Sequence, residues 1–336
     1  MIDIPIFPLA VTCQFLYVKD IEQLSFVNHY LYTFFDENDH VWKYSRQQAP
    51  FFLPSISSSR PEKQLALWCD YVYRRSKTSS SIVYLTSTLL NFKDAPGISG
   101  CILNRMYELL VSNEENVYSC FQNDSASAIS NAFLPGSLAE VTILSLRILI
   151  MLTHPEIFSL FGIEELAFYE RHVSKLELGP KIEAVLAKYS PNELIVELSF
   201  RLISNLSFRD NYLIYFRANG TLGTISSYLD MHAGCFAIQS VGLQAYINLL
   251  DTQNISDLLL EKTIKMALLA ILRYPNHKEL VENSLQLVKY CAIWHADRMA
   301  VTDVKQLIDL CTSICFDGNK NIKNLIAFLR LHVKFS

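Results

Sequence analysis

The residues best suited to chemistry are two pairs near the C-terminal end of the chain. Cys291 and His295 are four residues apart, and Cys311 and Cys315 repeat that spacing. Residues four apart lie on one face of a helix, so two packed helices could direct four ligands toward a tetrahedral zinc ion. The cysteines also interleave with leucine and isoleucine on apolar faces, where cysteine behaves as a small buried side chain. We therefore predict that this group binds no metal.

Other patterns typical of catalysis or cofactor binding are missing from the sequence. The Gly97–Gly100 segment is not followed by Gly-Lys-Ser/Thr, there is no Gly-x-Ser-x-Gly elbow, and the chain has only 10 glycines. The pairs Glu114-Glu115 and Glu164-Glu165 are adjacent, so on a helix their side chains point about 100 degrees apart. No set of residues supplies a nucleophile, a base and an orienting group together. We predict a protein that is not an enzyme and uses no cofactor or small-molecule substrate.

The composition is apolar for a chain that is expected to be elongated. Of the 336 residues, 51% are hydrophobic and 18% are charged, against a usual charged share of roughly 25%. Two interpretations remain open: a helical protein with tightly packed aromatic cores, or a subunit that buries apolar surface against partners. The net charge is −4 and no run of Lys and Arg exceeds two residues, which argues against nucleic-acid binding.

The N-terminus is apolar but does not read as a secretory signal. Asp3 stands where a basic segment should be, and Pro5 and Pro8 interrupt the apolar run. Val141–Leu152 is strongly apolar, but it is too short to cross a membrane and contains Arg147. We expect a soluble intracellular protein, cytoplasmic or nuclear, whose 8 cysteines are reduced.

The clearest secondary-structure pattern covers Glu197–Leu250. It predicts a long helix, a short helix, a third helix and then a second long helix. The apolar markers of these four elements are, in order, Leu198 with Leu202 and Leu206, Leu213 with Phe216, Leu222 with Ile225 and Leu229, and Ile238 with Val241, Ala245 and Leu249. Asn219-Gly220 is expected to end the short helix, because glycine tolerates the left-handed backbone found there.

Equivalent apolar positions recur through the C-terminal half. Phe200, Leu243, Leu285 and Phe328 are separated by 43, 42 and 43 residues. This period is typical of HEAT and armadillo arrays, in which stacked units share one continuous core. We therefore expect at least three stacked helical units and no sheet across residues 192–333.

The helix end Asn205-Leu206-Ser207, followed by a short helix and Asn219-Gly220, resembles the armadillo repeat in particular. The resemblance is best over residues 192–250. It implies an all-α armadillo/HEAT-like array that binds protein partners. The bound part of the partner would be an extended or helical segment, lying along a concave face lined by the long helices. The candidate contacts are Arg201, Asn205, Gln244 and Asn248, of which the two asparagines resemble the peptide-backbone clamps of some armadillo proteins.

Four further residues have two possible roles. Tyrosine and arginine are favoured at binding hot spots, but tyrosine also fills helix interfaces with its hydroxyl group in contact with water. A ligand groove and a packing role therefore both remain open for Tyr212, Tyr215, Arg217 and Tyr228.

The N-terminal region carries a second resemblance. Pro50-Phe51-Phe52, followed by Arg60 and by Gln64-Leu65 with Trp68, is similar to the start of the small winged-helix subunit of the ESCRT-II endosomal sorting complex. The resemblance implies a Pro-Phe-Phe segment that docks onto a larger subunit, with Phe51 and Phe52 as contacts. The alternative is that these rings are core anchors that cap the array. A strand pair within 79–121 would favour the winged helix, and continuous helices would favour the array.

We expect three regions along the chain: an aromatic-rich segment at 1–41, a helical or winged-helix-like region at 42–130, and armadillo-like repeats at 131–336. Asn123–Ser130 is small and polar and is expected to form the boundary before the repeats. Ile82–Leu90 fits a strand or a helix. The function predicted from these features is a non-enzymatic scaffold or adaptor within a multiprotein assembly, with an ESCRT-II-like sorting subunit as the alternative.

Overall fold

Helices supply the regular structure of this protein, seen here in a computed structural model. The model describes residues 72, 75–92, 96–113, 115–134, 137–156, 163–251, 255–299, 301–314 and 319–333, and this part of the chain contains no strand. The chain forms two compact units, the first comprising Met1–Leu152 and Ile157–Ala184 and the second Thr153–Glu156 and Val185–Ser336. The division predicted at residue 130 stays a prediction.

In the first unit the described helices are α6 (Ile82–Asn91), α7 (Pro96–Ser112), α8 (Glu115–Gln122), α9 (Ser125–Ala132), α10 (Ala139–Thr153, whose last residue belongs to the second unit) and α11 (Ile163–Ser174), and α12 (Leu178–Lys188) spans the division. In the second unit they are α13 (Glu193–Leu206), α14 (Asp210–Ala218), α15 (Thr221–Met231), α16 (Phe236–Leu249), α17 (Asp257–Arg273), α18 (Lys278–His295), α19 (Val301–Ser313) and α20 (Lys320–His332).

The structure shows the conformation of two segments of the first unit that the sequence left open or treated as a boundary. Ile82–Leu90, which fits a strand or a helix by sequence, lies in helix α6, and the Ser81 hydroxyl caps this helix by accepting from the Tyr84 amide at 3.2 Å. Most of the polar segment 123–130, expected to be a boundary, forms helix α9. Ser125 and Ser130 are buried, and the Ser125 hydroxyl lies 2.5 Å from the Thr86 hydroxyl of α6. Small hydroxyl residues can line a helix interface when neighbouring groups satisfy them.

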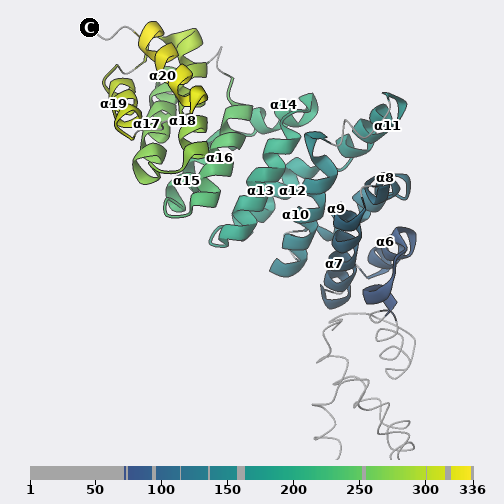
Figure 1. The fold of residues 1–336 in the computed structure, drawn as a ribbon. Coiled ribbons are helices and arrows are strands. Elements are labelled where there is room, and N and C mark those ends of the chain that lie inside the picture. The colour runs from purple at the N-terminus through teal and green to yellow at the C-terminus, as the bar shows by residue number, and fades with distance from the viewer. Residues whose placement is uncertain are drawn as a thin grey trace, which may run out of the picture. The chain divides into compact units, whose positions relative to one another are not determined.

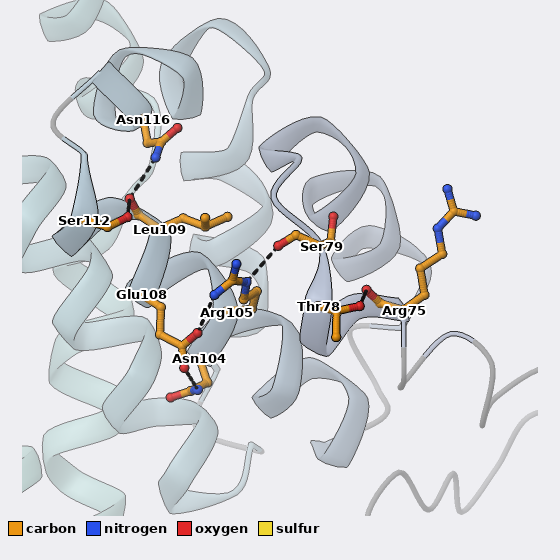
Figure 2. Close-up of polar contacts among 9 residues, drawn as sticks. All are labelled: Arg75, Thr78, Ser79, Asn104, Arg105, Glu108, Leu109, Ser112 and Asn116. Carbon is orange, nitrogen blue, oxygen red and sulfur yellow. Dashed lines mark hydrogen bonds and ion pairs between the residues drawn. The ribbon is translucent and has the colours of Figure 1, made fainter.

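Figure 2 shows how α7 holds the chain that precedes α6. The Arg105 Nε atom donates to the Ser79 carbonyl at 2.7 Å, and its Nη1 atom pairs with Glu108 at 2.8 Å. Within 79–121 the described residues form α6, α7 and α8 without a strand, which favours the helical array over a winged helix in this stretch. Phe51 and Phe52 lie outside the described residues.

The long helices of the second unit pack in sequence order. Helix α13 packs along α16, α16 along α18, and α18 along α20 (Figure 1). Helix α15 packs against α16, α17 against α18 and α19, and α19 against α20. The prediction of at least three stacked helical units without a sheet is confirmed for the described residues of 192–333. Leu243 and Leu285 are fully buried, as is Phe200, so these three markers share the core.

The later units differ from the first in two ways. Where the first unit has the short helix α14 and the third helix α15, the next unit has the single 17-residue helix α17, because its sequence contains no glycine or proline that would end it. In α20 the residue next to the marker, Leu329, is fully buried, whereas Phe328 is partly exposed beneath the Lys289 ammonium, 5.3 Å from its ring centroid.

Close packing between helices depends on one glycine. A Cβ atom on Gly242 of α16 would lie 2.6 Å from Leu229 Cδ2 and 3.1 Å from Phe200 Cδ2. Helices α13 and α15 therefore approach the α16 backbone at this point. Gly220 ends α14 with φ of 70°, the left-handed conformation that was expected there.

Candidate protein-binding surface

Helix α13 presents one polar stripe away from the core. Asn192 caps the helix by accepting from the Ile195 amide at 3.2 Å, which sets the start of the register. Arg201 is half-exposed and pairs with Glu197, four residues earlier, at 2.9 Å. An exposed pair of this kind contributes only about 0.3–0.5 kcal/mol. The Arg201 guanidinium can therefore exchange this carboxylate for one on a partner at little cost.

Helix α16 contributes two amides that are already bonded. The Gln244 Nε2 atom donates to Asn248 Oδ1 at 3.0 Å, and Asn248 Nδ2 lies 3.0 Å from Ser204 Oγ and 3.3 Å from the Ser204 carbonyl oxygen. Asn248 thus bridges α16 and α13. As a peptide-backbone clamp it is incomplete, because its donor group is used within the protein. The Gln244 carbonyl oxygen remains an acceptor of the kind that a peptide N–H needs.

The four predicted residues lie on adjacent faces of neighbouring helices. The Asn248–Ser204 bond joins residues 44 apart, so Asn248 lies at the level of Ser204 and of the next residue, Asn205, which is partly buried. One helical turn earlier, Arg201 and Gln244 occupy corresponding levels of their helices. We name Arg201, Asn205, Gln244 and Asn248 the α13/α16 face.

The tyrosines considered for a ligand groove serve helix packing instead. Tyr212 and Tyr228 are only 3% and 8% exposed. The Tyr228 hydroxyl donates to the Leu186 carbonyl at 2.6 Å, and the Tyr274 hydroxyl makes the corresponding bond to the Ala233 carbonyl at 3.0 Å. These bonds join residues 42 and 41 apart, so they tie one repeat to the next.

Arg217 also has a structural role. Its Nε atom donates to the Leu249 carbonyl at 2.8 Å and its Nη2 atom to the Leu250 carbonyl at 3.3 Å. These are carbonyls at the C-terminal end of α16, where the helix dipole favours a cation. Arg217 therefore caps α16 rather than facing a groove. Tyr215 is partly buried, with its ring edge-on to Phe216 at 5.7 Å.

Three of the four possible zinc ligands, Cys291, His295 and Cys311, are buried side chains of α18 and α19. Burial raises the pKa of both the Cys291 and the Cys311 thiols to about 12, so both are protonated at neutral pH. The His295 ring is buried too, and its Nδ1 atom lies 3.1 Å from Arg298 Nη1. Among the described residues, no group of three or more His, Cys, Asp or Glu side chains is arranged to hold a metal. Cys315 lies outside them, so the absence of zinc stays a prediction.

The sequence-based reasoning missed an exposed apolar surface on α18. Tyr290, Ile293 and Trp294 are 38%, 48% and 54% exposed. The signal was present, because Leu287, Cys291 and His295 recur every four residues on the buried face of the same helix. Tyr290, Ile293 and Trp294 occupy the other helical positions and project away from that face.

Comparison with known proteins supports the fold alone. No family model and no curated protein matches the sequence, so they give no support to the resemblance with the ESCRT-II subunit. Among solved structures, a designed armadillo repeat protein aligns with a TM-score of 0.56 and 9% identity, covering 76% of this chain and 100% of that chain. No helix in the described part of the chain is long and apolar enough to cross a membrane. The chain therefore has an all-α armadillo-like fold built from stacked helical repeats.

Proposed function

We propose that this chain is a non-enzymatic scaffold that binds a segment of a partner protein along the α13/α16 face, as a subunit of a multiprotein assembly. Folds of this kind are typically protein-binding scaffolds. The observation that supports the proposal is the Asn248–Ser204 bond, which holds α16 beside α13 at the level of the four candidate residues.

The chemistry of this surface suits an extended segment. Gln244 supplies an acceptor for a backbone N–H, and Arg201 supplies a cation for a carboxylate. Both side chains are held by contacts made at the protein surface, so rearranging them costs little compared with the hydrogen bonds gained.

The apolar character of the chain supports membership in an assembly. Ile214, Leu258 and Leu331 are 67%, 79% and 81% exposed. Single exposed apolar residues are ordinary, but here they occur on α14, α17 and α20 in a chain of low charge. Burial of several of these side chains against partners agrees with one of the two interpretations of the composition, a subunit that buries apolar surface against other proteins. Phe51 and Phe52 are proposed as a further contact on the sequence pattern alone.

Affinity capture of the full chain, with identification of the bound proteins, tests this proposal. The variant Arg201→Ala/Gln244→Ala changes only surface groups and should lose a captured protein. Lys265→Ala is the matched control, because it removes an exposed ion pair of the same i, i+4 type, with Glu261 on α17. Capture of the same proteins in unchanged amounts by all three forms would show that the α13/α16 face is not the binding surface.

A further inference from the structure

An exposed serine lies in a basic turn just before helix α6. Ser80 is exposed, and residues 79–81 form the non-helical connection between a helical turn at 75–78 and α6. In the sequence, Lys77 stands three residues before Ser80 and Arg75 stands five residues before it. An exposed hydroxyl that follows cations at these spacings has a charge pattern of the kind that protein kinases select in their substrates.

The Ser80 hydroxyl differs from the neighbouring hydroxyls because it makes no hydrogen bond within the described residues. The Thr78 hydroxyl donates to a backbone carbonyl three residues earlier at 3.4 Å, and Ser79 Oγ accepts from the Ser81 amide at 3.1 Å. Ser81 Oγ caps α6 by accepting from the Tyr84 amide at 3.2 Å. Ser80 is therefore an acceptor that a modifying enzyme reaches without first breaking a bond of its side chain.

The turn itself is held by few strong bonds. The Ser79 amide meets the Ser76 carbonyl at 3.4 Å, which is long for an N–H···O bond, and the Thr78 hydroxyl bond has the same length. The short bond that must open is the one from Arg105 Nε to the Ser79 carbonyl, at 2.7 Å. Exposed segments with few such bonds open at low free energy, so this turn can enter an active site.

Two arginines flank the turn. Because Arg105 of α7 donates to the Ser79 carbonyl, its guanidinium lies beside the peptide that joins Ser79 to Ser80 (Figure 2). The Arg75 guanidinium lies over the Tyr84 ring, 4.6 Å from its centroid, in the first turn of α6. Both arginines are therefore close to the point at which α6 begins.

A third cation, Lys77, lies near the same part of α7. Burial raises the pKa of the Cys101 thiol to about 11, the Lys77 charge acts in the opposite direction, and Glu108 raises this pKa further. Lys77 and Glu108 are therefore both near Cys101, which stands one helical turn before Arg105. Lys77 is exposed and forms no ion pair within the described part of the chain.

Carboxylates are fewer around the turn. Glu108 is paired with Arg105 Nη1 at 2.8 Å. Asp124 precedes α9, which bonds α6 at Thr86, more than one turn into that helix, and Glu115 begins α8 beyond the other end of α7. Three cations against the one neighbouring carboxylate of Glu108 leave a net positive charge beside the exposed serine.

We propose that Ser80 is a phosphorylation site for a protein kinase that selects basic residues, and that Arg105, Lys77 and the start of α6 hold the phosphate. In the transfer, the Ser80 oxygen bonds to the γ-phosphorus of ATP while the bond from that phosphorus to the β–γ bridging oxygen breaks. ADP leaves with the electron pair of the broken bond, and the hydroxyl proton passes to the catalytic carboxylate of the kinase.

The modification changes what holds the turn. A phosphate adds a charge of about −1.5 to −2, which nearby cations and the positive end of a helix dipole stabilise. Charge-assisted bonds from Arg105 and Lys77 then replace the long bonds that hold the turn in the unmodified chain. Phosphorylation thus fixes the start of α6 against α7.

Incubation of the full chain with ATP, Mg²⁺ and a kinase catalytic domain selective for basic residues three and five positions before the acceptor tests the site. Mass spectrometry should locate the phosphate on Ser80, and a kinase selective for acidic residues should leave Ser80 unmodified. Lys77→Gln should slow incorporation severalfold, because it removes one of the two selected cations. Ser87→Ala is the matched control, since Ser87 is an exposed serine of α6 with Tyr84 and Ile82 at those two positions. It should leave the rate unchanged.

Two results of this assay would overturn the site. One is phosphate on Thr78 or Ser79 in place of Ser80. The other is incorporation at the same rate in Ser80→Ala or in Lys77→Gln as in the unchanged chain.

Hydrogen exchange tests how the phosphate is held. Amides of the first turn of α6, at residues 83–85, should exchange severalfold more slowly in the phosphorylated full chain than in the unmodified chain. Arg105→Gln should lose most of this slowing, whereas Arg171→Gln, which changes an exposed arginine of α11, should keep it. Exchange that is unchanged or faster after phosphorylation, or equal slowing in Arg105→Gln, would overturn the role of Arg105. None of these readouts depends on partner binding at the α13/α16 face.

Discussion

Replacing Gly242 with alanine should destabilise the second unit, although the same change usually strengthens a helix. Alanine in place of glycine within a helix is favourable by about 0.5–1 kcal/mol. Here the new Cβ atom would lie 2.6 Å from Leu229 Cδ2 and 3.1 Å from Phe200 Cδ2. Both neighbours are buried, and overpacking of this kind costs about 1–3 kcal/mol. We expect a net loss of about 1–2 kcal/mol.

Thermal and urea denaturation of the full chain measure this effect. A loss of this size corresponds to a fall in Tm of roughly 2–8 °C for a unit of about 150 residues. Gly223 is the matched control, because it lies in α15 and a Cβ atom there would meet nothing within 4 Å. Gly223→Ala should leave stability unchanged or raise it by up to about 1 kcal/mol. If Gly242→Ala stabilises the protein as much as Gly223→Ala, the close approach of α13, α15 and α16 is wrong.

Four further predictions concern Tyr228, the buried thiols, the zinc content and the Phe51-Phe52 pair. Tyr228→Phe removes the hydroxyl that donates to Leu186 and should lower the free energy of unfolding by about 1 kcal/mol, measured by urea denaturation; an unchanged midpoint would contradict a bond between repeats. Burial raises the pKa of the Cys291 and Cys311 thiols from 9.0 to about 12, so at pH 8 both should react with a thiol reagent far more slowly in the native protein than in urea. Elemental analysis should find no stoichiometric zinc, and zinc lost on Cys311→Ser would reverse that prediction. Replacing Phe51-Phe52 with alanines should weaken partner capture while Tm stays nearly constant; a fall in stability of about 3–5 kcal/mol per ring would instead identify core anchors.

Much of the fold could be predicted because its signals are local. The apolar spacing around Leu202 predicts the end of α13, and the Asn219-Gly220 stop predicts the end of α14 at Ala218, but α13 begins at Glu193, four residues before the pattern that starts at Glu197. The sequence analysis did not predict α17 as one 17-residue helix, because the repeat pattern read from Glu197–Leu250 does not show how a unit without a breaker is built. Helix α9 was missed because its serines look like a loop until buried partners such as Thr86 are known.

The candidate site was harder to predict because it depends on register between helices. The sequence shows that Asn205 and Asn248 are equivalent, but it does not show that Ser204 lies close enough to bond the Asn248 amide. A polar side chain on an exposed helix face can bond either to a neighbouring helix or to a partner protein. Which of the two it does depends on the offset between neighbouring helices along their axes. The same argument applies to Tyr228. Tyrosine is a residue type common at binding hot spots, but the position of Tyr228 lets its hydroxyl bond the preceding repeat.

This distinction separates two kinds of surface along the array. Between α13 and α16 the stacking is close, because Gly242 admits its neighbours, and the polar groups above the core bond one another. A partner must exchange those bonds, so this face can discriminate by hydrogen bonding while gaining little from apolar burial. In α18 and α20, by contrast, Trp294 and Leu331 are 54% and 81% exposed. A partner that covers such side chains gains from the burial of apolar area and displaces few hydrogen bonds. The α13/α16 face is therefore suited to reading a peptide backbone, whereas exposed apolar side chains are suited to anchoring a partner.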